Sequence, residues 1–299
     1  MSSDQPGVSD APPATPAAPI LKIATFNAEN FYMLLDHAYT PAELSALDHA
    51  DYLAMNKSIY NPNKDLAKIA AIGQTILDEG FDFVGLCEVG GLETLRNFNH
   101  YFLDDRYDCY LHQQNSSRGI FVGALLKKGR FYDVKARNMK GDFSRNLLGI
   151  NLTFAGIKLD FFVVHLKSHY GRDAGLQKRV QEVQALCSLV RLTNCVVLGD
   201  FNGILVRGDQ QFEFEPFLAL PFRDVLEAMG VPASARFSHY HFGETASFNQ
   251  LDYIFCTEDI AILDGGMMVG DIPATFRERR LLPSDHIFLK AVIRPFARR

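Results

Sequence analysis

Residues 282–289 read LPSDHIFL, in which Asp285 and His286 stand side by side before an apolar segment. Residues 287–293 are apolar enough to predict the last strand of the fold. Pro, Ser and Asp are also common in turns, because proline restricts φ and the short polar side chains bond to nearby backbone amides. The eight residues alone therefore allow both a plain turn and a functional acid–histidine pair.

The same arrangement, a polar side chain at the end of an apolar strand, recurs along the chain. Strands are predicted at 21–26, 81–87, 107–112, 119–126, 147–154, 157–166, 195–198, 248–256 and 287–293. The polar residues at or beside their ends are Asn27, Glu29, Glu88, His165, Asp200, Asn202, Asp252, Asp285 and His286. Because open α/β sheets build their sites at strand ends, this recurrence favours a functional site over a series of turns.

Three chemistries could use these residues. A Ser284–Asp285–His286 triad is disfavoured, because successive side chains of a strand point to opposite faces. A zinc site is disfavoured because His165, His169 and His286 lack compact ligand spacing. Carboxylate oxygens instead suit Mg²⁺ or Mn²⁺, which bind phosphate oxygens well. With an Asp-oriented histidine as general base, the set predicts a phosphate-ester hydrolase.

Helical patterns alternate with the strands. The apolar spacing predicts helices at 66–79, ended by Gly80, at 92–103, and at 174–192 with Leu176, Val180, Val183 and Leu186 on one face. Residues 33–64 form a polar, loop-like insertion with one helix start, the capping box Thr40-Pro41-Ala42-Glu43. Mixed sheets covered by helices are expected, and the insertion is expected to wall the site and set specificity.

Six segments in order carry a family resemblance: FNAEN (26–30), LCEV (86–89), VVHLKSH (163–169), LGDFNG (198–203), QLDYIF (250–255) and SDHIFL (284–289). Together they resemble the endonuclease/exonuclease/phosphatase superfamily, the deoxyribonuclease I-like proteins, in a bacterial-type form. The resemblance spans about residues 21–294. It implies a four-layered α/β sandwich, with two mixed β-sheets packed face to face and flanked by helices.

The resemblance also implies a role for each residue. Glu88, Asn27, Asp285 and Glu29 would form the metal shell, His286 would be the general base, and Asp252 would orient it. Asp200 and Asn202 would position the nucleophile and the phosphate, and His165 would donate to phosphate oxygens. Asp285 would face the metal and His286 the water, on opposite sides of one strand.

Three basic residues are candidate phosphate ligands: Arg118, Arg145 and Lys167. Guanidinium groups suit phosphate recognition, although a solvated surface position is an equally good interpretation. The family pattern is not matched everywhere. Gly90 stands where abasic endonucleases usually carry Lys, residues 249–252 read NQLD rather than the Cys-Asp-Arg signature of 5-phosphatases, and there is no Trp.

These residues predict a Mg²⁺- or Mn²⁺-dependent phosphoesterase, a phosphodiesterase or nuclease in preference to the alternative, a phosphomonoesterase acting on an inositol or nucleotide phosphate. A catalytically silent binding scaffold is the alternative from another class. The net charge of −5 argues against a broad nucleic-acid footprint, although DNA and RNA remain candidate substrates. No obligate protein partner is evident.

The remaining features concern organisation and location. Residues 1–20 are Pro- and Ala-rich and predict a disordered leader, with one catalytic domain over 21–299. No apolar run is long enough for a membrane helix, and the leader lacks the features of a signal peptide. Five cysteines without Cys-x-x-Cys spacing fit a reducing, cytoplasmic setting.

Overall fold

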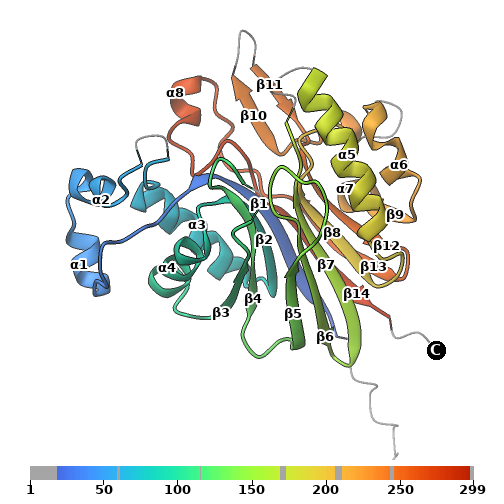
Figure 1. The fold of residues 1–299 in the computed structure, drawn as a ribbon, viewed down its shortest axis with the longest axis horizontal. Coiled ribbons are helices and arrows are strands. Elements are labelled where there is room, and N and C mark those ends of the chain that lie inside the picture. The colour runs from blue at the N-terminus through green and yellow to red at the C-terminus, as the bar shows by residue number, and fades with distance from the viewer. Residues whose placement is uncertain are drawn as a thin grey trace, which may run out of the picture.

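The computed structural model describes residues 19–58, 61–114, 116–168, 173–205, 211–242 and 246–296. At its centre are two six-stranded mixed sheets, ordered β13-β14-β1-β2-β4-β3 and β5-β6-β7-β8-β12-β9 (Figure 1). Almost all of the proposed leader, and His169, fall outside the described residues. Among the helices that are described, none has the length and apolar character needed to cross a membrane.

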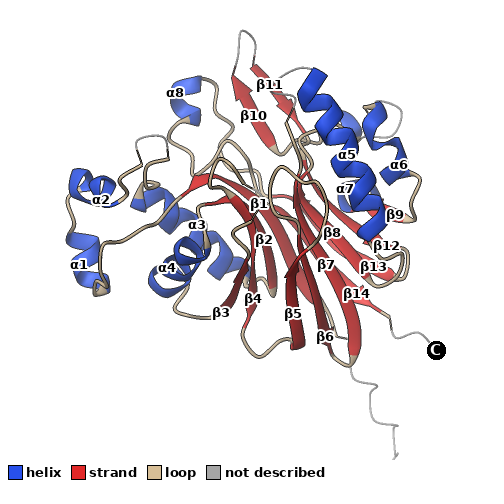
Figure 2. Cartoon of the chain, viewed as in Figure 1, coloured by secondary structure: helices blue, strands red, loops and turns tan. Residues whose placement is uncertain are grey.

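The first sheet is covered by two helices on its outer face (Figure 2). Its strands are β1 (Leu21–Phe31), β2 (Phe83–Val89), β3 (Tyr107–Leu111), β4 (Phe121–Lys127), β13 (Ile260–Met267) and β14 (Leu289–Pro295). Helices α3 (Leu66–Glu79) and α4 (Leu92–Phe102) bury Ile72, Ile76 and Leu95 in one apolar cluster with Val84 and Leu86 of β2.

The second sheet is covered in the same way on its own outer face. Its strands are β5 (Tyr132–Asn138), β6 (Leu148–Phe154), β7 (Ile157–His165), β8 (Cys195–Asp200), β9 (Phe222–Asp224) and β12 (Asp252–Thr257). Helices α5 (Asp173–Leu189) and α6 (Glu215–Leu218) pack there through Val183, Leu186 and Phe217.

Shorter elements complete the described chain. They are α1 (Pro41–Ala46), α2 (His49–Met55), α7 (Val225–Ala228), α8 (Phe276–Arg279), the 3₁₀ turns Phe212–Phe214 and Ala233–Ala235, and the hairpin of β10 (His239–Phe242) with β11 (Ala246–Asn249). Helix α8 and the β10–β11 hairpin project from the same end of the two sheets (Figure 1).

The inner faces of the two sheets share one apolar core. The rings of Phe83 on β2 and Phe161 on β7 stack with their centroids 4.2 Å apart. Gly85 lets the sheets approach closely, because a Cβ there would lie 3.1 Å from Leu198 and 3.2 Å from Val163. Truncating either ring to Ala would cost about 3–5 kcal/mol. The helix–sheet–sheet–helix order confirms the predicted four-layered sandwich.

The topology brings the polar strand ends to one edge. Strands β1 and β2 are parallel, as are β7 and β8, so Asn27, Glu88, His165 and Asp200 all lie toward the carboxyl ends of parallel strands. Strand β12 runs antiparallel to β8 and begins at that edge, with Asp252 opposite Asp200. Strand β14 runs antiparallel to β1, so the segment before it reaches the same edge.

Local predictions are confirmed where short-range signals are strong. Gly80 ends α3 in a left-handed conformation, the Thr40–Glu43 capping box is formed, and β6 and β7 pair as a hairpin across Ala155 and Gly156. Other predictions are corrected. The strand predicted at 248–256 is two strands separated at 250–251, the last strand begins at Leu289, and the insertion holds two helices instead of one.

The predicted inner face of α5 is also corrected. Leu176 and Val180 are only half-buried, whereas Arg179 and Glu182 are almost completely buried together with Val183. These two charged residues are satisfied internally. Glu182 accepts hydrogen bonds from the backbone amides of residues 144 and 167, and Arg179 forms a buried ion pair with Glu213. The rotation of this helix about its axis is therefore set by the internal partners of its charged residues, which the apolar periodicity does not register.

Candidate functional site

A buried carboxylate–imidazole pair forms the centre of the site. Nδ1 of His286 lies 2.6 Å from Oδ2 of Asp252, the first residue of β12. Oγ of Ser284 accepts a hydrogen bond from the His286 amide at 3.0 Å and donates to the Asn27 carbonyl at 2.7 Å. Because these bonds fix both the ring and its backbone, Nε2 of His286 is the nitrogen left to act on a substrate.

Asp200 lies close to three other predicted residues. Its Oδ2 accepts a hydrogen bond from Nδ2 of Asn27 at 2.9 Å and lies 3.5 Å from Nε2 of His165 and 4.0 Å from Nε2 of His286. Gly199 makes this placement possible, because a Cβ there would lie 2.0 Å from the Val164 carbonyl oxygen. The fold thus gathers three of the other predicted residues around the Asp200 carboxylate.

The protonation of these buried groups is strongly perturbed. Burial raises the pKa of Asp200 to about 7, and the negative charge of Asp252 adds to the rise. Burial alone would lower the pKa of His286, but the charge and hydrogen bond of Asp252 outweigh it and raise that pKa to about 10. For His165, burial and then the Arg145 charge hold the pKa well below the usual range. His165 is therefore neutral at pH 7.

Strained backbone places several of the predicted residues. Glu29, Glu88 and Asn202 have φ values of 44°, 63° and 53°. Such left-handed conformations cost L-residues of order 1–3 kcal/mol and concentrate at functional sites. Oε2 of Glu88 accepts a hydrogen bond from the Asn30 amide at 2.9 Å, while Oε1 lies 3.9 Å from Nε2 of His165. The Glu88 carboxylate therefore lies between the Asn30 amide and the His165 ring.

Two of the four predicted metal ligands, Glu29 and Asp285, are bound to Arg279 in this structure. Nη2 of Arg279, from α8, lies 2.7 Å from Oε1 of Glu29 and 2.6 Å from Oδ2 of Asp285, so these two carboxylates share one guanidinium. Among the described residues, the compact donor groups are Asp200–Asp252–His286 and His239–Asp285–His286. Glu88 and Asn27 lie on the Asp200 side of the site.

The predicted opposition of Asp285 and His286 is wrong. Both residues precede β14, and Oδ1 of Asp285 lies 3.9 Å from Nε2 of His286. The alternation of a strand does not apply, because the serine-anchored turn carries both side chains toward the same site. The hydrogen bond from His239 and the charges of His286 and Arg279 outweigh burial and lower the pKa of Asp285.

The remaining predicted residues lie around this centre. Arg145 is buried, so a solvated surface position is excluded for it, and its Nη1 donates to the Leu166 carbonyl at 3.4 Å. Nδ2 of Asn202 donates to the same carbonyl at 2.9 Å. Arg118 is exposed, with Nη2 3.3 Å from Oδ1 of Asn30. Lys167 is half-buried, and its backbone amide is bound by Glu182.

Three residues of the candidate site were not predicted from the sequence. Lys64 is buried, with its Nζ donating to the Glu29 carbonyl at 2.9 Å. Nε2 of His239 lies 3.6 Å from Oδ2 of Asp285, and its ring centroid is 4.6 Å from that of His286. For Arg279, the basic run RERR at 277–280, directly before LPSD, was an available signal. For the other two, no local pattern distinguishes them from surface residues.

Gly90 has a packing role at the position where the family comparison placed a lysine. A Cβ at Gly90 would lie 2.2 Å from the ring of Tyr32. The hydroxyl of Tyr32 in turn donates to the carbonyls of Arg118 and Gly119, at 3.2 and 2.9 Å. The tyrosine thus fills the space that a longer side chain would need.

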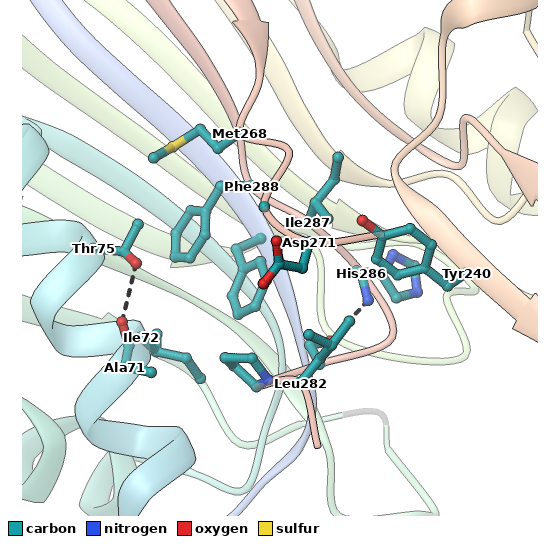
Figure 3. Close-up of a pocket in the computed structure, with 14 residues that line it drawn as sticks. Ala71, Ile72, Thr75, Tyr240, Met268, Asp271, Leu282, His286, Ile287 and Phe288 are labelled. Carbon is teal, nitrogen blue, oxygen red and sulfur yellow. Dashed lines mark hydrogen bonds between the residues drawn. The ribbon is translucent and has the colours of Figure 1, made fainter. Parts of the chain in front are cut away.

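A separate apolar cavity of about 220 Å³ borders His286 (Figure 3). Ile72, Leu282 and Phe288 line it, with Met268 above and Tyr240 beside His286. Of the predicted site residues, only His286 reaches it. Such walls offer little to a phosphate group, so the candidate site is the carboxylate–histidine cluster and not this cavity.

Comparison with solved structures supports the same fold. TDP2 from D. rerio, in complex with a single-strand DNA product, has a TM-score of 0.60 and 18% identity over 92% of this chain and 98% of its own. A mannosyl-6-phosphatase from Bacteroides thetaiotaomicron gives 0.59 and 16% over 91% and 99%. An endonuclease/exonuclease/phosphatase from Beutenbergia cavernae gives 0.61 and 15% over 92% and 72%.

The sequence comparisons agree with these structural ones. No curated protein matches the chain. The model of the Endonuclease/Exonuclease/phosphatase family matches residues 24–286, which include the polar strand ends from Asn27 to His286. The chain therefore belongs to the Endonuclease/Exonuclease/phosphatase family.

Proposed function

We propose that the chain hydrolyses phosphate diesters, including nucleic-acid phosphodiesters, in a reaction that depends on Mg²⁺ or Mn²⁺. The observation that carries the proposal is the 2.6 Å Asp252–His286 pair, held beside Asp200 at the edge where the parallel strands end. A positioned imidazole with an orienting carboxylate is the arrangement used to activate water by general-base catalysis.

The donor set fits a hard divalent ion on one side of the site. Glu88, Asn27 and Asp200 offer carboxylate and amide oxygens, the ligands that Mg²⁺ and Mn²⁺ prefer. One oxygen of Asp285 and one of Glu29 are bound by Arg279, so Arg279 would compete with the ion for them. When bound, such an ion would neutralise phosphate oxygens and so favour attack at phosphorus.

The protein groups have separate proposed tasks in this reaction. In its neutral form, the minor form at pH 7 when the pKa is about 10, His286 accepts the proton of the attacking water at Nε2, and Asp252 holds the ring in place through Nδ1. Neutral His165 donates from Nε2 to a phosphate oxygen, and Arg145 balances the charge that collects there. Asn202, tied to the Leu166 carbonyl, fixes the loop that follows Asp200.

The test compares several substrates with and without metal. Turnover of bis(p-nitrophenyl) phosphate, plasmid DNA and RNA is measured with Mg²⁺ or Mn²⁺ and again after thorough chelation. Loss of turnover on chelation is expected, and undiminished activity would refute the metal requirement. Release of inorganic phosphate from inositol and nucleotide monophosphates, without diester cleavage, would show a phosphomonoesterase. Stoichiometric binding with no turnover of any substrate would favour a silent scaffold.

A further inference from the structure

A cavity of about 380 Å³ lies directly beside the candidate site, on the side of Glu29. The insertion, α3 and α8 all contribute to its walls, which include Glu29, Asn63, Lys64, Lys68, Arg279 and Arg280. Glu29 belongs to both places, because its carboxylate contacts the Asp285 amide and Arg279, while its carbonyl contacts Lys64. A chemical group bound in the cavity would therefore be part of the substrate that occupies the site, or would lie close to that substrate.

The basic side chains of this cavity differ in whether a carboxylate forms an ion pair with them. Arg279 is matched by the carboxylates of Glu29 and Asp285. Nζ of Lys64 instead donates to the Glu29 carbonyl at 2.9 Å, and Nζ of Lys68 donates to the Arg280 carbonyl at 2.7 Å. Within the described part of the chain, no carboxylate forms an ion pair with Lys64, Lys68 or Arg280. Four basic residues line the cavity against the two acidic residues Glu29 and Asp65, so it carries an excess of positive charge.

The position of Lys64 is fixed before any ligand arrives. Its side chain is only 8% exposed, and its backbone amide donates to the Tyr32 carbonyl at 2.9 Å. The carbonyl of Lys64 accepts a hydrogen bond from the buried Tyr52 of α2 at 3.0 Å. A buried cation that makes no ion pair favours an anion as ligand, and fixed geometry lowers the entropy lost on binding.

We propose that this cavity binds a second phosphate group of the substrate, one that is not cleaved. The inference rests on the proposed function, because the scissile phosphate is taken to lie at the neighbouring cluster. It names the substrate class as a phosphate ester that carries another phosphate a short linker away. It also gives the insertion a specificity role, through Asn63 and Lys64 in the wall.

The test uses substrate pairs that differ in one group. Hydroxyalkyl p-nitrophenyl phosphates are compared with their terminally phosphorylated counterparts, over alkyl chains of graded length. In the wild type, the added phosphate is expected to raise kcat/KM by about tenfold or more at the best length, the range for one charged hydrogen bond. Lys68→Gln and Arg280→Gln should each remove most of this advantage without changing the hydroxyl substrate, because neither residue belongs to the catalytic cluster.

Matched control variants come from the same elements. Lys57→Gln lies in the insertion and Arg277→Gln on α8, and neither residue lines the cavity. Both should keep the full phosphate advantage. When the esters are cleaved, the inference is overturned if no chain length shows an advantage, or if Lys68→Gln and Arg280→Gln retain it.

A binding measurement separates this inference from the proposed function. Isothermal titration compares alkyl bisphosphonates with monophosphonates of the same length, and needs no turnover. Tighter bisphosphonate binding that Lys68→Gln abolishes supports the cavity, even if neither nitrophenyl ester is cleaved and the proposed function fails. Equal affinities for the two ligands would refute the cavity, even if diester hydrolysis is observed.

Discussion

Replacing Asp252 by Asn removes a negative charge while keeping the shape of the side chain that orients His286. The carboxylate is completely buried, and one oxygen lies 2.6 Å from Nδ1 of His286. An amide oxygen can still accept a hydrogen bond from that nitrogen, so the ring should keep its place. What changes is the electrostatic environment of the imidazole.

The size of the change follows from the pKa of His286. In the folded protein burial lowers that pKa, but the charge and hydrogen bond of Asp252 outweigh burial and raise the pKa from 6.5 to about 10. At about 1.4 kcal/mol per pH unit, this corresponds to roughly 5 kcal/mol of preferential stabilisation of the protonated ring. A raised histidine pKa stabilises the fold fully below pH 6.5, and the contribution is lost as pH rises through about 10. Asp252→Asn should therefore destabilise strongly at pH 6 and much less above pH 10.

The assay is urea unfolding at both pH values, followed by circular dichroism or tyrosine fluorescence, since the chain has no Trp. Titration of His286 by NMR should show its pKa falling well below 10, because burial is then opposed only by the charges of Asp285 and Asp200. Asp224→Asn is the control, since Asp224 is also a buried acid beside β12 but makes no contact with His286. An equal loss of stability at both pH values, or a His286 pKa still near 10, would refute the assignment of Asp252.

Further predictions concern the neighbouring charges. His286→Ala should lower kcat by ~10²–10⁴-fold and leave the metal affinity unchanged. Asp285→Ala should instead weaken Mn²⁺ binding, as measured by calorimetry. If the two variants showed the reverse pattern, the roles of the two residues would have to be exchanged. Arg279→Gln should tighten Mn²⁺ binding by freeing two carboxylates, and Arg277→Gln should not; unchanged affinity in Arg279→Gln would contradict this competition. Burial lowers the pKa of Lys64 from 10.5 to about 8, so the fold loses up to about 3 kcal/mol as pH falls from about 10.5 to about 8. Urea unfolding of Lys64→Met should lack that loss, and an identical pH dependence in both proteins would exclude it.

The strand ends and their chemistry could be predicted because they depend on short-range patterns. Apolar runs identified most of the strands around the site, and the polar residues that follow them were visible without any contact information. Carboxylates, amides and imidazoles in that order indicated phosphate-ester chemistry before their geometry was known. Gly80 and the Thr40–Glu43 box were equally readable, because a left-handed cap and a capping box are local structures.

What the sequence could not show is which charges meet across large separations. Arg279 reaches Glu29 across 250 positions, and Lys64 reaches the Glu29 carbonyl across 35. Neither contact has a periodic signature, because a salt bridge between distant segments depends on how the sheets, the insertion and α8 pack. Because of the turn at Ser284, the side chains of Asp285 and His286 likewise do not alternate between opposite faces as expected for a strand. The sequence by itself determined the kinds of groups at this sheet edge, and only the tertiary structure decided which carboxylates remain available to a metal ion.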